Sequence, residues 1–111
     1  MISYGWSQPV KLKKISDQVD DIIPKENKLY QNHPNPFNPS TKIIFTIPKS
    51  ETIKIELYNT LGQKIETLLN KAMKAGYHEV EFIGSHLSSS IYFCRIEAGE
   101  FQDVKKMILL R

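Results

Sequence analysis

Three histidines and one cysteine are the residues of this chain best suited to metal binding or nucleophilic catalysis. His33, His78 and His86 lack the i, i+4 spacing and the paired carboxylates typical of a metal site. Cys94 would need a general base nearby, and its spacing from His78 and His86 is not typical of a catalytic pair. A lone cysteine also excludes an internal disulfide and a cysteine-rich zinc site. The sequence therefore predicts no enzyme, no cofactor and no metal site.

The last seven residues, Lys105–Arg111, are the strongest candidate for a binding surface. Two lysines precede the apolar run Met107–Leu110, and the last side chain is a cation. One interpretation is a closing edge strand, on which Lys105 and Lys106 oppose sheet-to-sheet aggregation. The other is a recognition edge, to which a partner adds a strand by β-augmentation and offers pockets for the apolar side chains. The two are compatible, because an edge protected against self-pairing still fits a shaped partner.

Three prolines within six residues make His33–Thr41 the most distinctive stretch of the chain. Each proline fixes its own φ and pushes the preceding residue towards extended geometry. The two asparagines of the stretch are predicted to fold onto nearby backbone N–H groups as Asx turns. We expect a stiff corner anchored by its one large apolar residue, Phe37, and favour a structural role over a binding epitope. The motif consists of Pro34, Asn35, Pro36, Phe37, Asn38 and Pro39.

The elements that position these residues are predicted to be strands, because apolar residues recur at every second position from Leu29 onward. Such alternation is typical of antiparallel strands with one solvated face. Gly99 permits the positive φ that a tight hairpin between the last two strands needs. The predicted strands are Thr41–Ile47, Thr52–Tyr58, Tyr77–Phe82, Ile91–Ala98 and Phe101–Leu110, and their number and spacing predict a β-sandwich. The predicted core comprises Ile43, Phe45, Ile53, Ile55, Leu57, Val80, Phe82, Tyr92, Cys94 and Ile96.

The segment Leu61–Ala75 admits two interpretations. Its apolar residues fall at helical spacing, Thr60 with Gln63 resembles a capping box, and Gly76 lies where a helix would end. The alternative is a turn, a strand at Lys64–Leu69 and a loop up to Gly76, which suits the all-β neighbourhood. The pattern alone leaves this choice open.

Composition and charge exclude several classes of protein. The chain has 111 residues, of which 41% are hydrophobic and 24% charged, as expected for one globular domain. No apolar run approaches the roughly 20 residues that span a bilayer. The net charge of +3 is spread along the chain and not gathered on one segment, which argues against a nucleic-acid partner.

Residues 1–28 differ in pattern from the rest. Leu12, Ile15, Val19 and Ile22 recur at spacings that fit a short amphipathic helix. We favour a linker, or the remnant of an upstream domain, over that helix, because so short a segment is unstable in water unless it packs on something.

Seven short motifs, in register along the chain, carry a resemblance to a known family. They are Leu29–Asn32, Pro34–Thr41, Tyr58–Asn59 with Leu61–Gln63, Ala75–His78, Ile91–Phe93, Glu97–Gly99 and Lys105–Met107. Together they closely resemble the type A C-terminal sorting domain of the type IX (Por) secretion system, from about Lys28 to Arg111. Each motif alone is weak, whereas the combination is specific.

The resemblance implies an immunoglobulin-like antiparallel β-sandwich of about seven strands over residues 29–111, and it favours the strand at Lys64–Leu69. It implies a non-catalytic targeting module that directs an exported cargo protein, fused on its N-terminal side and absent here, through the translocon. The expected partners are the outer-membrane translocon and a sortase-like processing peptidase. The expected locations are the periplasm in transit, then the outer-membrane surface or the medium. No cofactor, nucleic acid or transmembrane segment is expected.

The resemblance also assigns roles to residues. The residues expected to meet the translocon are Gly99, Lys105, Lys106, Met107, Ile108, Leu109, Leu110 and Arg111. Gly62, Gly76 and Tyr92 join the proline motif as structural residues. Three positions depart from the usual family pattern: His33 replaces a tyrosine, Ser90 a glycine and Cys94 an apolar or aromatic residue.

Tyr92 precedes Cys94 by two residues, which is the spacing of the tyrosine corner in immunoglobulin-like folds. With no second cysteine to pair with, Cys94 is expected to be a buried thiol.

Two alternative functions remain at this point. One is an adhesive or carbohydrate-binding sandwich that uses exposed aromatic residues, for which Tyr58, Tyr77 and Phe93 are candidates. The other is a structural cap in a surface assembly, which would self-associate at low micromolar concentration.

Overall fold

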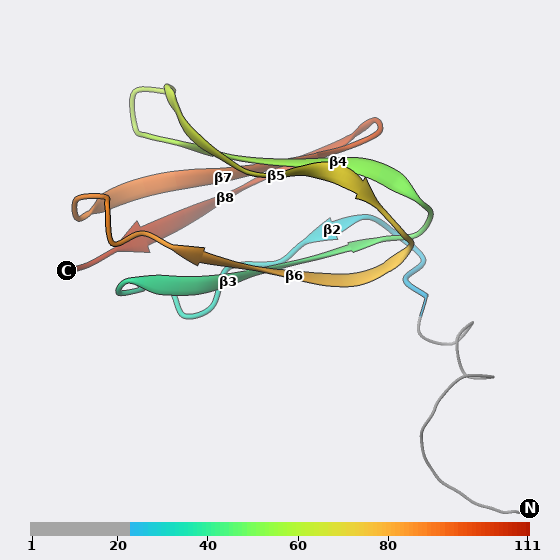
Figure 1. Ribbon diagram of the computed structural model, residues 1–111, viewed down its shortest axis with the longest axis horizontal. Helices are drawn as coiled ribbons and strands as arrows, with labels where there is room; N and C mark the ends of the chain where they lie inside the picture. The colour runs from blue at the N-terminus through green and yellow to red at the C-terminus, as the bar shows by residue number, and fades with distance from the viewer. Residues whose placement is uncertain (1–22) are drawn as a thin grey trace, which may run out of the picture.

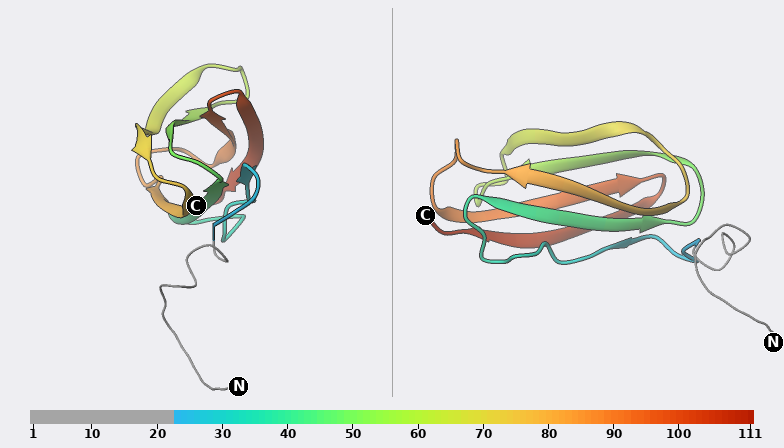
Figure 2. Two further views of the ribbon diagram at one scale, coloured as in Figure 1. Left: turned by 90° about the vertical axis from the view of Figure 1, so that its right-hand side faces the viewer. Right: turned by 60° about the horizontal axis from the view of Figure 1, so that its bottom comes forward.

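Two antiparallel β-sheets stack face to face in the computed structural model, which describes residues 23–111 (Figures 1 and 2). The smaller sheet has the order β2-β3-β6 and the larger sheet the order β5-β4-β7-β8. The predicted all-β sandwich is confirmed, and the apolar pattern at residues 12–22 lies outside the described residues. The strands are β2 (Lys28–Leu29), β3 (Ser40–Ile47), β4 (Glu51–Tyr58), β5 (Lys64–Met73), β6 (Gly76–Ile83), β7 (Ser90–Ala98) and β8 (Phe101–Leu109).

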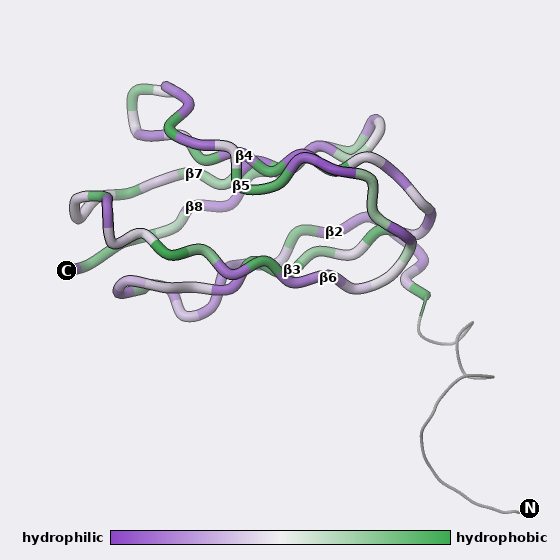
Figure 3. The backbone as a smooth tube through the Cα atoms, viewed as in Figure 1, coloured by the Kyte–Doolittle hydropathy of each residue, from purple (hydrophilic) through white to green (hydrophobic). Residues whose placement is uncertain are grey.

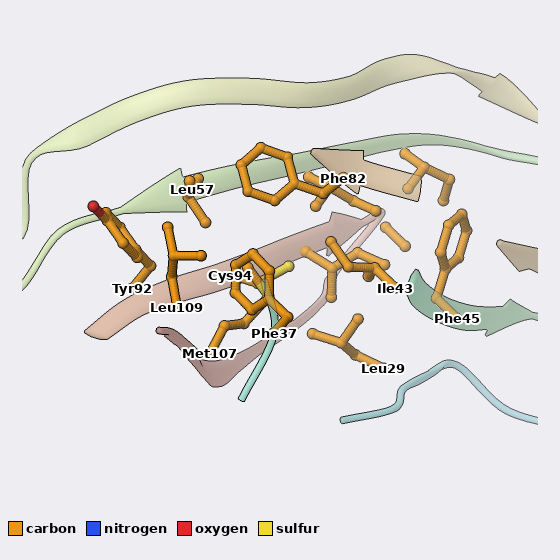
Figure 4. Packing of buried hydrophobic residues seen from close by; sticks show 14 of the residues in the cluster. Leu29, Phe37, Ile43, Phe45, Leu57, Phe82, Tyr92, Cys94, Met107 and Leu109 are labelled. Carbon is orange, nitrogen blue, oxygen red and sulfur yellow. The ribbon is translucent and has the colours of Figure 1, made fainter. Parts of the chain in front are cut away.

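The core fills the space between the sheets, where alternate residues of each strand meet (Figure 4). In β4, for example, Ile53, Ile55 and Leu57 are fully buried. Each such side chain contributes roughly 1.5–3 kcal/mol of hydrophobic stabilisation. Every predicted core residue is buried except Val80, which is half-buried against the cluster. The structure adds Leu29, Phe37, Ile47, Ala98, Met107 and Leu109.

The segment after β4 is a strand, as the resemblance implied, and not a helix. β5 runs over Lys64–Met73, so it is longer than predicted and leaves only two residues before Gly76. Its register against β4 shifts twice, once between Ile55 and Glu56 and once between Leu57 and Tyr58. Each β-bulge adds one residue to a strand. These additions interrupt the period of two, which explains why the apolar residues of this segment fall at helix-like intervals.

The start of β7 has the tyrosine corner of an immunoglobulin-like sandwich. The Tyr92 hydroxyl donates a hydrogen bond of 2.8 Å to the carbonyl oxygen of Ser88, in the loop before the strand. Two residues later, Cys94 is buried in the core, and this burial raises the pKa of its thiol to about 12. Cys94 is therefore a space-filling thiol, as the sequence predicted.

The β7–β8 hairpin turns through two residues, Gly99 and Glu100. Gly99 has a φ of 63°, in the left-handed region that favours glycine. A Cβ atom at this position would also clash with the Glu51 carboxylate. The predicted role of Gly99 in a tight hairpin is confirmed.

Candidate functional site: the proline strap and the terminal strand

The proline motif lies beside the last strand, although the two are far apart in the sequence. We call residues 31–39 the proline strap. It follows β2, crosses from the smaller sheet to the larger one, and runs parallel to the end of β8, with Phe37 opposite Leu109 (Figure 2). The two most distinctive segments of the sequence therefore form one surface.

Four hydrogen bonds join the strap to the outer edge of β8. The Gln31 amide donates to the carbonyl oxygen of Lys106 at 2.6 Å, and the Asn35 side-chain oxygen accepts from the N–H of Ile108 at 2.9 Å. The Phe37 N–H donates to the carbonyl oxygen of Ile108 at 2.8 Å, and the Phe37 carbonyl oxygen accepts from the N–H of Leu110 at 3.1 Å. The edge of β8 is therefore already paired from Lys106 to Leu110.

Phe37 fixes the strap in the sandwich. Its side chain is 1% exposed and packs edge-on against Phe82, with ring centroids 6.1 Å apart. Figure 4 shows it among Met107, Leu109 and the core of the other strands. The predicted anchor is confirmed.

A buried polar network holds the beginning of the strap. The Asn32 amide donates to the carbonyl oxygen of Pro34 at 3.0 Å and to the Thr41 hydroxyl at 2.9 Å. That hydroxyl donates in turn to the same carbonyl oxygen at 2.8 Å. Because a buried polar group without a partner is costly, this closed set specifies the path of the chain.

The expected Asx turns at the two motif asparagines are wrong. Asn35 bonds across to β8 and not to its own segment. Asn38 is exposed, and its side chain makes no hydrogen bond within residues 23–111. The backbone N–H of Ile108 has no partner in β7 and needs an acceptor. Asn35 supplies that acceptor, so its side chain turns towards β8 and not onto its own segment.

The predicted recognition residues on β8 point in two directions. Met107 and Leu109 are fully buried in the core, so they are not free to fill pockets of a partner. Lys106, Ile108 and Leu110 lie on the outer face, where Leu110 is 55% exposed. Within residues 106–110, only these three side chains are available for contact.

The first half of β8 is protected in another way. Asp103 and Lys105 share the inward-facing side of the strand with Met107, and their charged groups lie 3.9 Å apart. Charges on the inward side of an edge strand oppose the addition of another strand.

The remaining two recognition residues lie apart from each other. The Arg111 guanidinium donates to the carbonyl oxygens of Gly84, Ser85 and Leu87 in the β6–β7 loop, and its backbone N–H donates to the Ser89 hydroxyl at 2.9 Å. Gly99 is at the opposite end of β8, in the hairpin. The predicted set is thus not one patch, and Arg111 is held against a loop.

A charged cluster on the outer face of the larger sheet was missed by the sequence reasoning. The Glu56 carboxylate is almost fully buried, and it accepts hydrogen bonds from the Tyr58 hydroxyl at 2.9 Å and the Lys64 ammonium at 3.2 Å. The Tyr58 bond is the main cause that lowers the pKa of Glu56, followed by Lys64 and Lys54, while burial opposes them. These partners come from β4 and β5, and no spacing in the sequence predicts the bulged register that brings them together.

Beside this cluster is a shallow depression of about 380 Å³. Tyr58 and Phe93 are directly opposite each other in the β4–β7 register, and with Val104 they supply its aromatic and apolar walls. Tyr77, the third exposed aromatic candidate, lies on the other sheet.

The histidines are dispersed. His78 bonds through Nε2 to the carbonyl oxygen of Lys74 at 2.6 Å, and His86 through Nε2 to the Glu66 carboxylate at 2.8 Å. Over residues 23–111, no three His, Cys, Asp or Glu side chains come close enough together to hold a metal ion. The same residues contain no helix with the length and apolar character needed to cross a membrane.

Comparison with known families agrees with this geometry. A family described as the secretion system C-terminal sorting domain matches residues 31–110. The matched span starts at the first residue of the proline strap and ends one residue after β8, so it includes both halves of the site. A search of curated proteins found no match. The chain belongs to the C-terminal sorting domains of the type IX (Por) secretion system.

Proposed function

We propose that this chain directs an exported cargo protein, fused to its N-terminal side, through the type IX translocon to the cell surface or the medium. The observation that carries the proposal is the family match over residues 31–110, which covers both the proline strap and the terminal strand. Sorting domains of this family are signals and not catalysts. The cargo crosses the periplasm before the translocon receives it, and a sortase-like peptidase then processes the domain.

The surface offered to the translocon is the strap with the outer face of the terminal strand. Pro34, Pro36 and Pro39 are exposed in the strap, whose Asn35 and Phe37 bond to the backbone of Ile108 and Leu110. Prolines present a preorganised surface, so little conformational entropy is lost on binding. We expect contact through side chains, because the strap already occupies the backbone edge that β-augmentation would need.

A reporter fusion tests the function. A fluorescent protein with an export signal is fused in front of the full 111-residue chain and expressed in a bacterium that has a type IX system. We expect the reporter outside the cells, and in the periplasm when the chain is omitted or the translocon is deleted. Equal delivery without the chain, or periplasmic retention with it in the intact strain, would refute the proposal.

The depression beside Tyr58 and Phe93 supports a second candidate function, the binding of a carbohydrate by stacking on aromatic rings. A glycan array probed with the full chain tests it, with Phe93→Ala as the matched variant. Glycans bound by the parent and lost by the variant would support this function, and an array without binders would remove it.

A further inference from the structure

The flank of the sandwich opposite the strap ends on two outer strands, β5 and β6 (Figure 2). β6 pairs with β3 along all eight residues from Gly76 to Ile83, without a register shift. Its other side has no strand partner among residues 23–111. β6 is therefore a regular sheet edge.

The hydrogen-bond pattern shows which residues of β6 present their backbone to the free side. In β3, Lys42 exchanges both of its backbone hydrogen bonds with His33, and the carbonyl oxygen of Ile44 accepts from Tyr30. Backbone groups alternate in direction along a strand, so the backbone groups of the odd-numbered residues of β3, from Thr41 to Ile47, face β6. Their partners are Gly76, His78, Val80 and Phe82. The N–H and C=O groups on the free side consequently belong to Tyr77, Glu79, Glu81 and Ile83.

The other long outer strands carry protection that β6 lacks. The end of β8 is covered by the strap, and at its beginning Asp103 and Lys105 place charged groups on the inward-facing side of the strand. β5 has two bulges and two lysines. β6 has no bulge, proline or lysine, and more and less exposed residues alternate along all of it. Its course changes from mostly hydrophilic at the start to hydrophobic at the end (Figure 3). Uncovered regular edges of this kind are templates for strand addition.

Glu79 and Glu81 determine which kind of strand can pair with the free edge of β6. If two copies of β6 paired antiparallel about Val80, Glu79 would lie opposite Glu81 of the other copy on both sides. Sliding one copy by two residues in either direction would place two copies of Glu79, or of Glu81, opposite each other. Directly opposed like charges destabilise a strand pair, whereas opposite charges stabilise it. Lys42 lies opposite Glu81 in the β3–β6 register, and its ammonium lies 3.4 Å from the Glu79 carboxylate. One lysine against two glutamates leaves this part of the outer face with a net negative charge.

We infer that β6 is a docking edge for an extended strand of a partner protein that carries lysine or arginine at alternate positions. The partner strand bonds to the free backbone groups of Tyr77, Glu79, Glu81 and Ile83, and its basic side chains lie across from the two glutamates. Tyr77 and Ile83, which are 62% and 54% exposed, supply apolar contacts at either end. This inference does not depend on recognition by the translocon, because the edge is on the opposite flank from the strap.

A peptide titration followed by NMR of the full, isotope-labelled chain tests the inference. The probe is the capped peptide Thr-Val-Lys-Val-Lys-Val-Thr, and the matched control has Glu in place of Lys. We expect the amide resonances of residues 77–83 to shift with the lysine peptide, which binds roughly tenfold more tightly than the control. The double substitution Glu79→Lys with Glu81→Lys is expected to reverse the preference. Equal affinities, no binding at millimolar peptide, or shifts confined to other strands would overturn the inference.

Two further comparisons separate strand pairing from simple charge attraction. Glu81→Pro removes the N–H on the free side and leaves the ladder with β3 intact, whereas Glu81→Thr removes only the charge. We expect the proline variant to lose binding that the threonine variant retains in weakened form. A lysine peptide methylated on alternate backbone nitrogens tests the same point without altering the protein. Binding that survives both changes would contradict strand addition.

Discussion

The side-chain oxygen of Asn35 accepts a hydrogen bond of 2.9 Å from the backbone N–H of Ile108, 73 residues later in the chain. This bond joins the proline strap to the terminal strand and occupies an edge group that would otherwise face solvent. Together with the two main-chain bonds of Phe37, it converts an open sheet edge into a closed surface. A partner that meets this part of the molecule therefore encounters side chains and not free backbone.

Replacing Asn35 with alanine removes the acceptor for the N–H of Ile108. We expect the free energy of unfolding to fall by about 1 kcal/mol and amide hydrogen exchange at Ile108 to accelerate. The matched control is Asn38→Ala, because Asn38 is exposed in the same motif. Denaturant unfolding and hydrogen exchange check both variants, and an equal loss in the two would contradict the role of the Asn35 bond.

Phe37→Ala empties the site that fixes the strap between the sheets. For a fully buried phenylalanine the expected loss is about 3–5 kcal/mol, which is a large part of the stability of a small domain. Tyr77→Ala, at an exposed aromatic, is expected to change stability by about 0.5 kcal/mol or less. Thermal unfolding measures both; a Phe37 variant as stable as the Tyr77 variant would show that the strap is not anchored by this side chain.

Tyr92→Phe deletes one hydroxyl and leaves the ring in the core. The Ser88 carbonyl oxygen then loses its donor, so we expect a loss of about 0.5–1.5 kcal/mol with an unchanged fold. Chemical denaturation with circular dichroism at the start and end points makes the measurement. Unchanged stability would mean that the tyrosine corner contributes nothing here.

The strands and most of the core could be predicted from the sequence, because alternation of apolar and polar residues is a local property. The length of β5 could not be predicted, since two bulges shift its register against β4 and disturb the period of two. The anchor role of Phe37 followed from its being the one large apolar residue of the motif.

The site itself was only partly predictable. Both halves were identified, but their contact was not, because it is parallel, is made largely by main-chain atoms and joins segments at opposite ends of the domain. The burial of Met107 and Leu109 follows from the alternation along β8, which separates them from Ile108 and Leu110. The position of Arg111 depends on backbone carbonyl groups of a loop. Every residue has such a group, so the sequence does not show which of them converge on one side chain.

Glu56→Gln tests the charged cluster on the larger sheet. The pKa of Glu56 is lowered from its ordinary value of 4.5, so its carboxylate stabilises the fold at neutral pH and this contribution is lost as the pH falls through the folded-state pKa. We expect a loss of about 1–3 kcal/mol at pH 7. The difference from the parent should shrink steadily below pH 4.5.

The control for this prediction is Glu79→Gln, which alters an exposed ion pair with Lys42 and should cost little at any pH. Urea unfolding across the pH range compares the three proteins. A Glu56 variant whose deficit is constant with pH would show that the carboxylate charge is not the stabilising feature.

The location of a reporter fused to a surface variant tests the central claim most directly. Lys106→Glu, Ile108→Ser and Leu110→Ser are combined, which changes the outer face beside the strap and leaves the buried Met107 and Leu109 in place. The control is Val104→Ser, on the same face of the same strand but beyond the strap. If the strap and the terminal strand form the recognised surface, the triple variant stays folded and its reporter accumulates in the periplasm, while the control is delivered outside the cell. Delivery of the folded triple variant at the parental level would contradict the account.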